Sequence, residues 1–231
     1  MFYGGNPLFY SSLLLLVPAI LLSLYAQYKV SSTYKKYSKA RAASGVTGAQ
    51  ASRMILDREG LGDVEIEVVQ GHLTDHYDPR KRVLRLSDGV ANSDSLAALG
   101  VAAHEAGHAI QHARNYAPMR IRSAVVPAAS FGSNFGPIIF MVGLFMSSFR
   151  ELMTIGIVLF TAAVIFQIVT LPVEFDASSR AMKLLQTNGL VAGPEAGGAR
   201  KVLSAAALTY VAAALMSILM LVRMVLLRGD E

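Results

Sequence analysis

Two histidines with a glutamate directly after the first are the residues of this chain best suited to chemistry. They lie in the run His104-Glu105-Ala106-Gly107-His108, which matches the H-E-x-x-H pattern of zinc peptidases. On a helix, residues four apart share one face, so His104 and His108 can bind one metal ion. Glu105 would then lie beside a zinc-activated water and take its proton. The pattern predicts a zinc-dependent metalloendopeptidase in which Glu105 is the catalytic general base.

The residues around this motif predict a buried helix. The run 96–103 is almost wholly apolar, and a helix that is apolar on all sides is buried. We expect the helix to cover about residues 94–115. His112 continues the series of histidines, but it lies about 12 Å from His104 along the helix axis, too far to share one ion. We therefore place His112 beside the metal site or on the surface.

A third protein ligand is expected, because catalytic zinc takes three and leaves one position open. The candidate segment is 171–181, which follows a long apolar run and contains Pro172, a residue suited to the start of a new helical turn. Glu174 is the predicted ligand, and Asp176 is the alternative. Asp176 and Arg180 are four apart, so they can also form an ion pair along the helix.

The composition is that of a membrane protein. Apolar residues make up 53% of the 231 residues and charged residues only 16%, and the mean hydropathy is +0.44. The absence of cysteine excludes disulfides and thiolate metal sites. The net charge of +5 does not indicate nucleic-acid binding, because the basic residues lie next to hydrophobic segments and not on an aromatic-interleaved face.

Four apolar segments are long enough to cross a bilayer. The first has an alternative as a cleaved signal peptide, although its start lacks the usual positive residues. The second has an alternative as a buried helix of the soluble part. The expected organisation is transmembrane helices at 8–28, 123–149, 152–173 and 202–222, a catalytic part with the H-E-x-x-H helix at 29–122, and a third-ligand helix and loop at 174–201.

The distribution of Lys and Arg predicts the orientation. The stretches 29–122 and 174–201 contain all but three of the 21 basic residues, and such stretches face the cytoplasm. We therefore expect a multi-pass protein of the cell (inner or plasma) membrane, with its active site at the cytoplasmic face. Arg223 and Arg228 disagree with this assignment, because they would lie outside.

The larger polar stretch shows signs of both helix and strand. Thr47 and Gln50 have the spacing of a capping box, which predicts a helix to about Glu59. Residues 64–69 and 83–87 alternate polar and apolar side chains, as half-buried strands do. By analogy with other zinc peptidases, we expect 83–87 to be the edge strand over the metal. The alternative is that 64–69 and 83–87 form an ordinary hairpin that packs on the helices. The predicted fold class is a mainly α integral membrane protein with about four transmembrane helices and a cytoplasmic α+β zincin-like catalytic part carrying a small β-hairpin or sheet.

Several segments together resemble a known family, the YugP-like neutral zinc metallopeptidases of bacterial membranes. This family is distantly similar to the HtpX and CAAX prenyl proteases, which are gluzincins. The resemblance implies one Zn²⁺ per chain, a protein or peptide substrate at the membrane, His104, His108 and Glu174 as ligands, and Glu105 as base. HtpX-type enzymes have an Asp that orients a metal histidine where this chain has Ser178. The segments that carry the resemblance are 74–79, 83–87, 104–111 and 171–178.

Some features stay open at this stage. The oxyanion of the transition state needs a hydrogen-bond donor besides zinc. The candidates for this donor are His76, Tyr77, Tyr116 and Arg180. Ser178 and Asp176 are candidates for hydrogen bonds that support the metal ligands. Two other functions compete with the peptidase, namely an intramembrane site-2-type protease and a non-enzymatic membrane adaptor with a structural metal site. Oligomeric state is not predicted.

Overall fold

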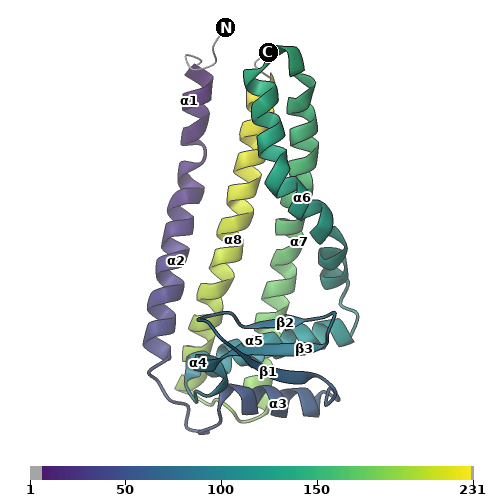
Figure 1. The fold of residues 1–231 in the computed structure, drawn as a ribbon. Helices are drawn as coiled ribbons and strands as arrows, with labels where there is room; N and C mark the ends of the chain where they lie inside the picture. Colours follow the sequence, from purple (N-terminus) through teal and green to yellow (C-terminus); the bar gives the residue numbers. More distant parts are fainter. Residues whose placement is uncertain (1–6, 230–231) are drawn as a thin grey trace. The chain divides into compact units, whose positions relative to one another are not determined.

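The computed structural model describes residues 7–229 and is mainly helical (Figure 1). The chain divides into two compact units, which are described one at a time. Within the described residues, unit 1 consists of 7–26, 120–172 and 209–229, and unit 2 consists of 27–119 and 173–208. The elements are α1 (Pro7–Leu14), α2 (Val17–Tyr37), α3 (Gly48–Arg58), β1 (Glu65–Val69), β2 (His76–Asp78), β3 (Val83–Ser87), α4 (Asp88–Ala91), α5 (Leu96–Ala113), α6 (Ala117–Phe145), a 3-10 turn η2 (Ser147–Phe149), α7 (Glu151–Thr187) and α8 (Pro194–Gly229).

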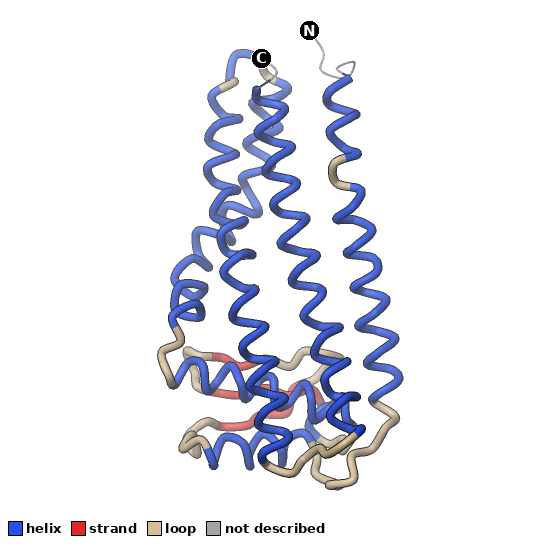
Figure 2. The backbone as a smooth tube through the Cα atoms, turned by 180° about the vertical axis from the view of Figure 1, so that it is seen from behind, coloured by secondary structure: helices blue, strands red, loops and turns tan. Residues whose placement is uncertain are grey.

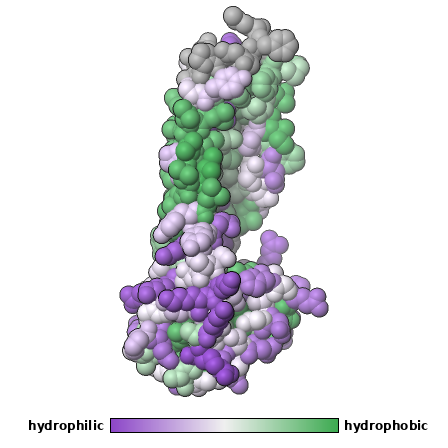
Figure 3. Space-filling view, turned by 90° about the vertical axis from the view of Figure 1, so that its left-hand side faces the viewer, coloured by the Kyte–Doolittle hydropathy of each residue, from purple (hydrophilic) through white to green (hydrophobic). Residues whose placement is uncertain are grey.

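The prediction of four candidate membrane spans is confirmed. Four helical stretches among residues 7–229 are long and apolar enough to cross a bilayer, and Figure 3 shows the hydrophobic surface of unit 1. Pro172 does not start a new helix as expected, because α7 continues through it. A proline removes only one backbone hydrogen bond, and long apolar helices tolerate that loss. The four stretches are Phe9–Tyr37, Ala117–Phe145, Glu151–Thr187 and Pro194–Gly229.

Unit 1 is held together by close packing of α6 against α7. A Cβ atom added to Gly156 would lie 2.6 Å from the carbonyl oxygen of Gly136, so the two backbones are in direct contact. Small residues at such crossings are typical of helix pairs in membranes. The large buried side chains of Phe140, Met153 and Phe160 fill the space beside this crossing. The short 3-10 turn η2 connects the two helices.

Arg223 is buried among the helices of unit 1, whereas the sequence predicted that it lies outside the membrane. Its residue is only 6% exposed, its Nε donates a hydrogen bond to Oγ of Ser12 at 3.2 Å, and its guanidinium lies over the ring of Phe9. A charged side chain within membrane helices faces other protein groups and not lipid. Arg223 is therefore a side chain of the helix bundle, and its charge does not belong to a loop.

Unit 2 contains a three-stranded mixed sheet, seen from behind in Figure 2. The strand order is β1-β3-β2, with β1 parallel and β2 antiparallel to the central strand β3. Helices α3 and α5 pack on each other and against the sheet. The buried core of unit 2 includes Ile55, Leu84, Leu86 and Leu99, which are fully inaccessible. These contacts place α5 directly beside the strands.

The small sheet is present as expected, but two details expected for its strands are wrong. The strands at 64–69 and 83–87 do not form a hairpin, because β1 and β3 run parallel. The edge strand nearer α5 is β2, and 83–87 is the central strand. The chain reverses before β2 with Gly71 and Leu73 at φ +112° and +56°, and Asp75 then accepts hydrogen bonds from the backbone and hydroxyl of Ser87. A strand of only three residues in a turn-rich segment has no clear alternation to predict it.

The helix boundaries of unit 2 follow their predicted caps. Thr47 and Gln50 form the complete capping box at the start of α3, and Glu59 caps its end. Ser95 caps α5, with its hydroxyl accepting from the backbone N–H of Ala98 at 3.2 Å. Such caps satisfy backbone N–H groups that have no partner within the helix. The start of α5 is therefore fixed about two turns before His104.

Candidate metal centre

Helix α5 places two imidazole rings on one side. His104 and His108 are four residues apart, and their rings meet edge to face with centroids 4.7 Å apart. The apolar residues on the rest of α5 are buried, which fixes the rotation of the helix. The two rings are therefore presented together toward a neighbouring helix.

That neighbour is α7, and a glycine allows it to approach. A Cβ atom added to Gly107 would lie 2.9 Å from the carbonyl oxygen of Ala177. Real side chains essentially never show so short a contact, so a residue other than glycine would force the helices apart. The close approach carries Glu174, one turn before Ala177, to the two histidines.

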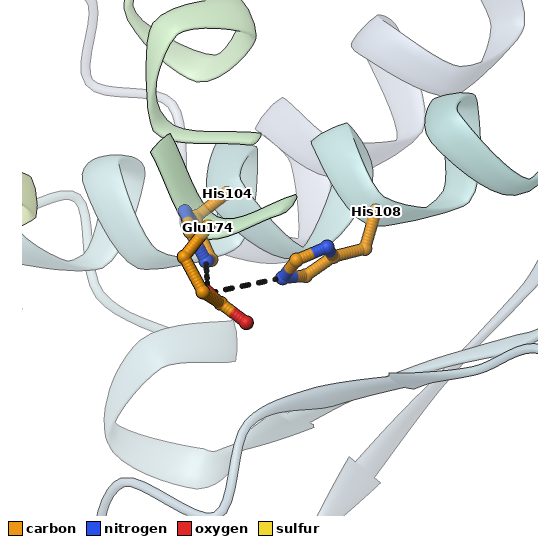
Figure 4. A group of neighbouring side chains, drawn as sticks. All are labelled: His104, His108 and Glu174. Atoms are coloured by element: carbon orange, nitrogen blue, oxygen red, sulfur yellow. Dashed lines mark hydrogen bonds and ion pairs between the residues drawn. The ribbon is translucent and has the colours of Figure 1, made fainter. Parts of the chain in front are cut away.

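The three side chains converge on a small volume (Figure 4). Oε2 of Glu174 lies 3.1 Å from Nε2 of His104 and 3.5 Å from Nε2 of His108. One donor atom from each residue lies within 4.8 Å of the others, and this is the one such group found among residues 7–229. The Glu174 side chain is 2% exposed. A carboxylate this buried needs positive partners, and a metal ion between these atoms is one such partner.

The comparison with known proteins agrees with this geometry. Residues 12–229 match the model of a family described as "Putative neutral zinc metallopeptidase". The chain belongs to this zinc metallopeptidase family. It is 50% identical over 213 residues to "Putative membrane protease YugP" of Bacillus subtilis (strain 168), covering 92% of this chain and 94% of that protein. No solved structure matches the chain.

In this member of the zinc metallopeptidase family, each histidine is also held at its other ring nitrogen. Nδ1 of His108 hydrogen-bonds with Oε1 of Gln111 at 3.0 Å, and Nδ1 of His104 hydrogen-bonds with Oγ of Ser178 at 3.2 Å. Protein groups at Nδ1 fix the tautomer and the ring orientation of metal-binding histidines. Both Nε2 atoms are thereby left directed at Glu174.

The fully buried Gln111 joins the site to a chain of polar groups on α7. Its Nε2 donates to the backbone carbonyl of Val173 and to Oδ2 of Asp176, both at 2.8 Å. Asp176 also forms an ion pair with Nε of Arg180 at 2.6 Å, and the Arg180 guanidinium lies over the ring of Tyr116. Burial and the charge of Asp176 raise the pKa of Tyr116. Asp176 is thus engaged by two donors of its own.

Glu105 lies between α5 and the edge strand. Its Oε2 accepts a hydrogen bond from the backbone N–H of Tyr77 in β2 at 3.0 Å. The Tyr77 hydroxyl in turn hydrogen-bonds with Nδ1 of His112 at 2.9 Å, so His112 contacts β2. Burial raises the pKa of Tyr77 above its ordinary value. Tyr77 therefore attaches strand β2 to α5 at two points, at Glu105 between the two histidines and at His112 one turn after His108.

Burial and the neighbouring carboxylates have opposite effects on the pKa of His108. Burial lowers the pKa of this imidazole, but the hydrogen bond to Glu174 and the charges of Glu105 and Glu174 outweigh burial and hold the pKa above its ordinary value. The surroundings therefore favour a positive charge at this position. A divalent cation would satisfy the same preference.

The remaining candidates are spread around the site. His76 is exposed, and its ring nitrogens hydrogen-bond with the carbonyl of Thr74 and with the guanidinium of Arg85. The positions of Tyr77, Ser178, Asp176 and Arg180 are described above. Gln111 was not among the residues predicted from the sequence. Its signal was present, since a glutamine three residues after His108 lies on the same face of a helix that is otherwise apolar.

Proposed function

We propose that this chain is a membrane zinc metalloendopeptidase of the gluzincin type, with His104, His108 and Glu174 as zinc ligands and Glu105 as the general base. The observation that carries the proposal is the convergence of three donor atoms within 4.8 Å, from the half-buried His104 and the buried His108 and Glu174. The family membership supports the same activity.

The donor set suits zinc. Two imidazoles and one carboxylate are the protein ligands of many catalytic zinc sites, which keep one position open. Hydrogen bonds at both Nδ1 atoms leave the Nε2 atoms of His104 and His108 to bind the ion. Asp176 is the weaker candidate for the third ligand, because Arg180 and Gln111 already engage its carboxylate. We propose one ion per chain.

In the proposed hydrolysis, the bound zinc, Glu105 and strand β2 have different roles. A bound zinc ion would acidify water and polarise the scissile carbonyl. The carboxylate of Glu105, next to His104 in the chain, takes a proton from the attacking water and gives it to the departing amine. Because the backbone of β2 reaches Glu105 through Tyr77, an extended peptide lying along this edge strand would have its scissile bond near the carboxylate.

We further propose the orientation and boundaries inferred from the basic residues. The catalytic part, 29–122 and 174–201, would face the cytoplasm, with spans at 8–28, 123–149, 152–173 and 202–222 in the cell membrane. Protein or peptide substrates would be cut at this membrane face. An intramembrane site-2-type protease is less well supported, because such an enzyme carries its histidines on a spanning helix and α5 is not among the candidate spans of residues 7–229.

The zinc content of detergent-purified full-length protein tests the proposal. Wild type and Glu151→Ala should each contain about one zinc, whereas Glu174→Ala should lose most of it. Glu151 is the matched control, an exposed glutamate at the start of the same helix. Folded wild type without zinc, after zinc has been supplied, would refute the proposal. Full zinc in Glu174→Ala would move the third ligand elsewhere, to Asp176 first.

A further inference from the structure

A pocket lined by several lysines and hydroxyl groups lies in unit 2 between the end of α2 and the start of α8. It has a volume of about 500 Å³, and its lining belongs entirely to unit 2. Neither the metal cluster nor Glu105 lines it. The residues used in the argument below are Lys29, Thr33, Lys36, Tyr37, Lys201 and Ser204.

The pocket carries an excess of positive charge. Lys29 and Lys36 are seven residues apart on α2, so they share one face of the helix, and Lys201 comes from α8. Within residues 7–229 none of the three forms an ion pair with a carboxylate, and no acidic residue lines the pocket. Three lysines from two helices around one hollow attract an anion.

Hydroxyl groups add hydrogen-bond donors between the lysines. Thr33 lines the pocket on the α2 side, and its hydroxyl can donate a hydrogen bond to a ligand there. Ser204 on α8 offers a second hydroxyl. Ammonium and hydroxyl donors together match the oxygens of a phosphate group.

The residues next to the pocket along α2 indicate that this phosphate belongs to a lipid. Leu21, Leu24, Tyr25 and Tyr28 are large and exposed, at 61%, 63%, 53% and 70%, and Lys29 follows them directly. Exposed tyrosines followed by lysine are typical of the boundary between hydrocarbon and head groups. On α8, Leu208 adds an apolar wall to the pocket. The proposed span 8–28 ends directly before Lys29, so the lysines lie at the level where lipid head groups are expected.

We propose that this pocket binds the phosphate head group of an anionic membrane lipid. Basic pockets between membrane helices are suited to such head groups. The lipid would bridge α2 and α8 at a point where they already touch, because a Cβ atom added to Gly198 would lie 2.9 Å from the ring of Tyr37. The same atom would lie 2.8 Å from Leu96, the first residue of α5. Lipid binding would therefore stabilise the contacts at the start of the histidine helix.

The test is lipid binding to delipidated full-length protein in a neutral detergent, followed by native mass spectrometry. The probes are short-chain phosphatidylglycerol, short-chain phosphatidylcholine and inorganic phosphate. Lys36→Ala/Lys201→Ala removes two pocket charges. Lys35→Ala/Lys39→Ala is the matched control, because it removes the same charge from exposed lysines outside the pocket. All four side chains are exposed, so neither variant should disturb folding.

We expect phosphatidylglycerol to bind wild type and the control equally and to bind Lys36→Ala/Lys201→Ala at least about tenfold more weakly. Equal loss in both variants, or equal binding of phosphatidylcholine, would overturn the proposal because the pocket would not recognise the anionic head group. Inorganic phosphate binding as tightly as the lipid would assign the pocket to a soluble phosphate instead. The readout does not involve peptidase activity, so its outcome is independent of the function proposed above.

Discussion

Gln111 fixes the tautomer of His108. The amide nitrogen of Gln111 donates to two acceptors, the carbonyl of Val173 and the carboxylate of Asp176. Its Oε1 must therefore be the atom that faces His108, 3.0 Å from Nδ1. An oxygen there accepts a hydrogen bond, so Nδ1 of His108 carries the proton and Nε2 keeps its lone pair for a metal.

The first prediction concerns Gln111→Met, which keeps about the same side-chain volume. It removes the oxygen that accepts from His108 and the nitrogen that donates to Val173 and Asp176. Without the acceptor at Nδ1, His108 loses its fixed tautomer, and zinc affinity should fall about 10- to 100-fold. The measurement is competition for zinc against a chromophoric chelator. Gln186→Met is the control, because Gln186 is an exposed glutamine on α7. Equal affinity in the two variants would remove Gln111 from the metal site.

The elements of unit 2 were predictable to the extent that local signals specify them. The capping box at Thr47 and the apolar run before His104 define α3 and α5 within a few residues. The order of the strands has no such local signal, because pairing depends on contacts distant in sequence. β1 and β3 run parallel because the chain reverses twice between them, once around Gly71 and Leu73 and once between β2 and β3, and hydrophobic alternation does not predict the first reversal.

The candidate site was predictable in its composition but not in its support. The spacing of His104 and His108, and the return of the chain through α7, suffice to suggest Glu174. The contact of Gly107 with Ala177 that brings Glu174 into place involves backbone atoms, and no residue pattern encodes it. Gln111 was not predicted, because the sequence places it on the face of His108 but does not show that its amide reaches Val173 and Asp176 on α7.

Ser178 gives the second prediction. Its hydroxyl is 3.2 Å from Nδ1 of His104, so Ser178→Ala removes one neutral hydrogen bond, worth about 0.5–1.5 kcal/mol. Zinc affinity should fall by about 2- to 10-fold, less than for Gln111→Met. Ser179→Ala, at the exposed neighbouring serine, should leave the affinity unchanged. Equal titration curves for the two alanine variants would show that Ser178 does not orient His104.

The third prediction uses two glycines of the histidine helix. In Gly107→Ala the new methyl group would press on the Ala177 carbonyl, and we expect a loss of about 1–3 kcal/mol in the free energy of unfolding. In Gly100→Ala the nearest atom would be 3.7 Å away, so the better helix propensity of alanine should add about 0.5–1 kcal/mol. Opposite shifts of the thermal unfolding midpoint in detergent would confirm the difference.

The same pair separates packing from metal binding. Because the displaced α7 carries Glu174, Gly107→Ala should also lower zinc content, whereas Gly100→Ala should retain it. If Gly107→Ala is as stable and as zinc-loaded as Gly100→Ala, then the close approach of α5 and α7 does not position Glu174.

The last prediction separates catalysis from metal binding at Glu105. Glu105→Gln keeps an oxygen that can accept the hydrogen bond from the Tyr77 backbone, but an amide cannot take a proton from water near pH 7. Hydrolysis of a labelled, unfolded protein such as casein should therefore fall about 100- to 10,000-fold, while zinc content and the unfolding midpoint stay near wild type. Glu174→Ala should lose both activity and zinc. Wild-type cleavage by Glu105→Gln would exclude Glu105 as the base, and loss of zinc in that variant would instead place Glu105 among the ligands.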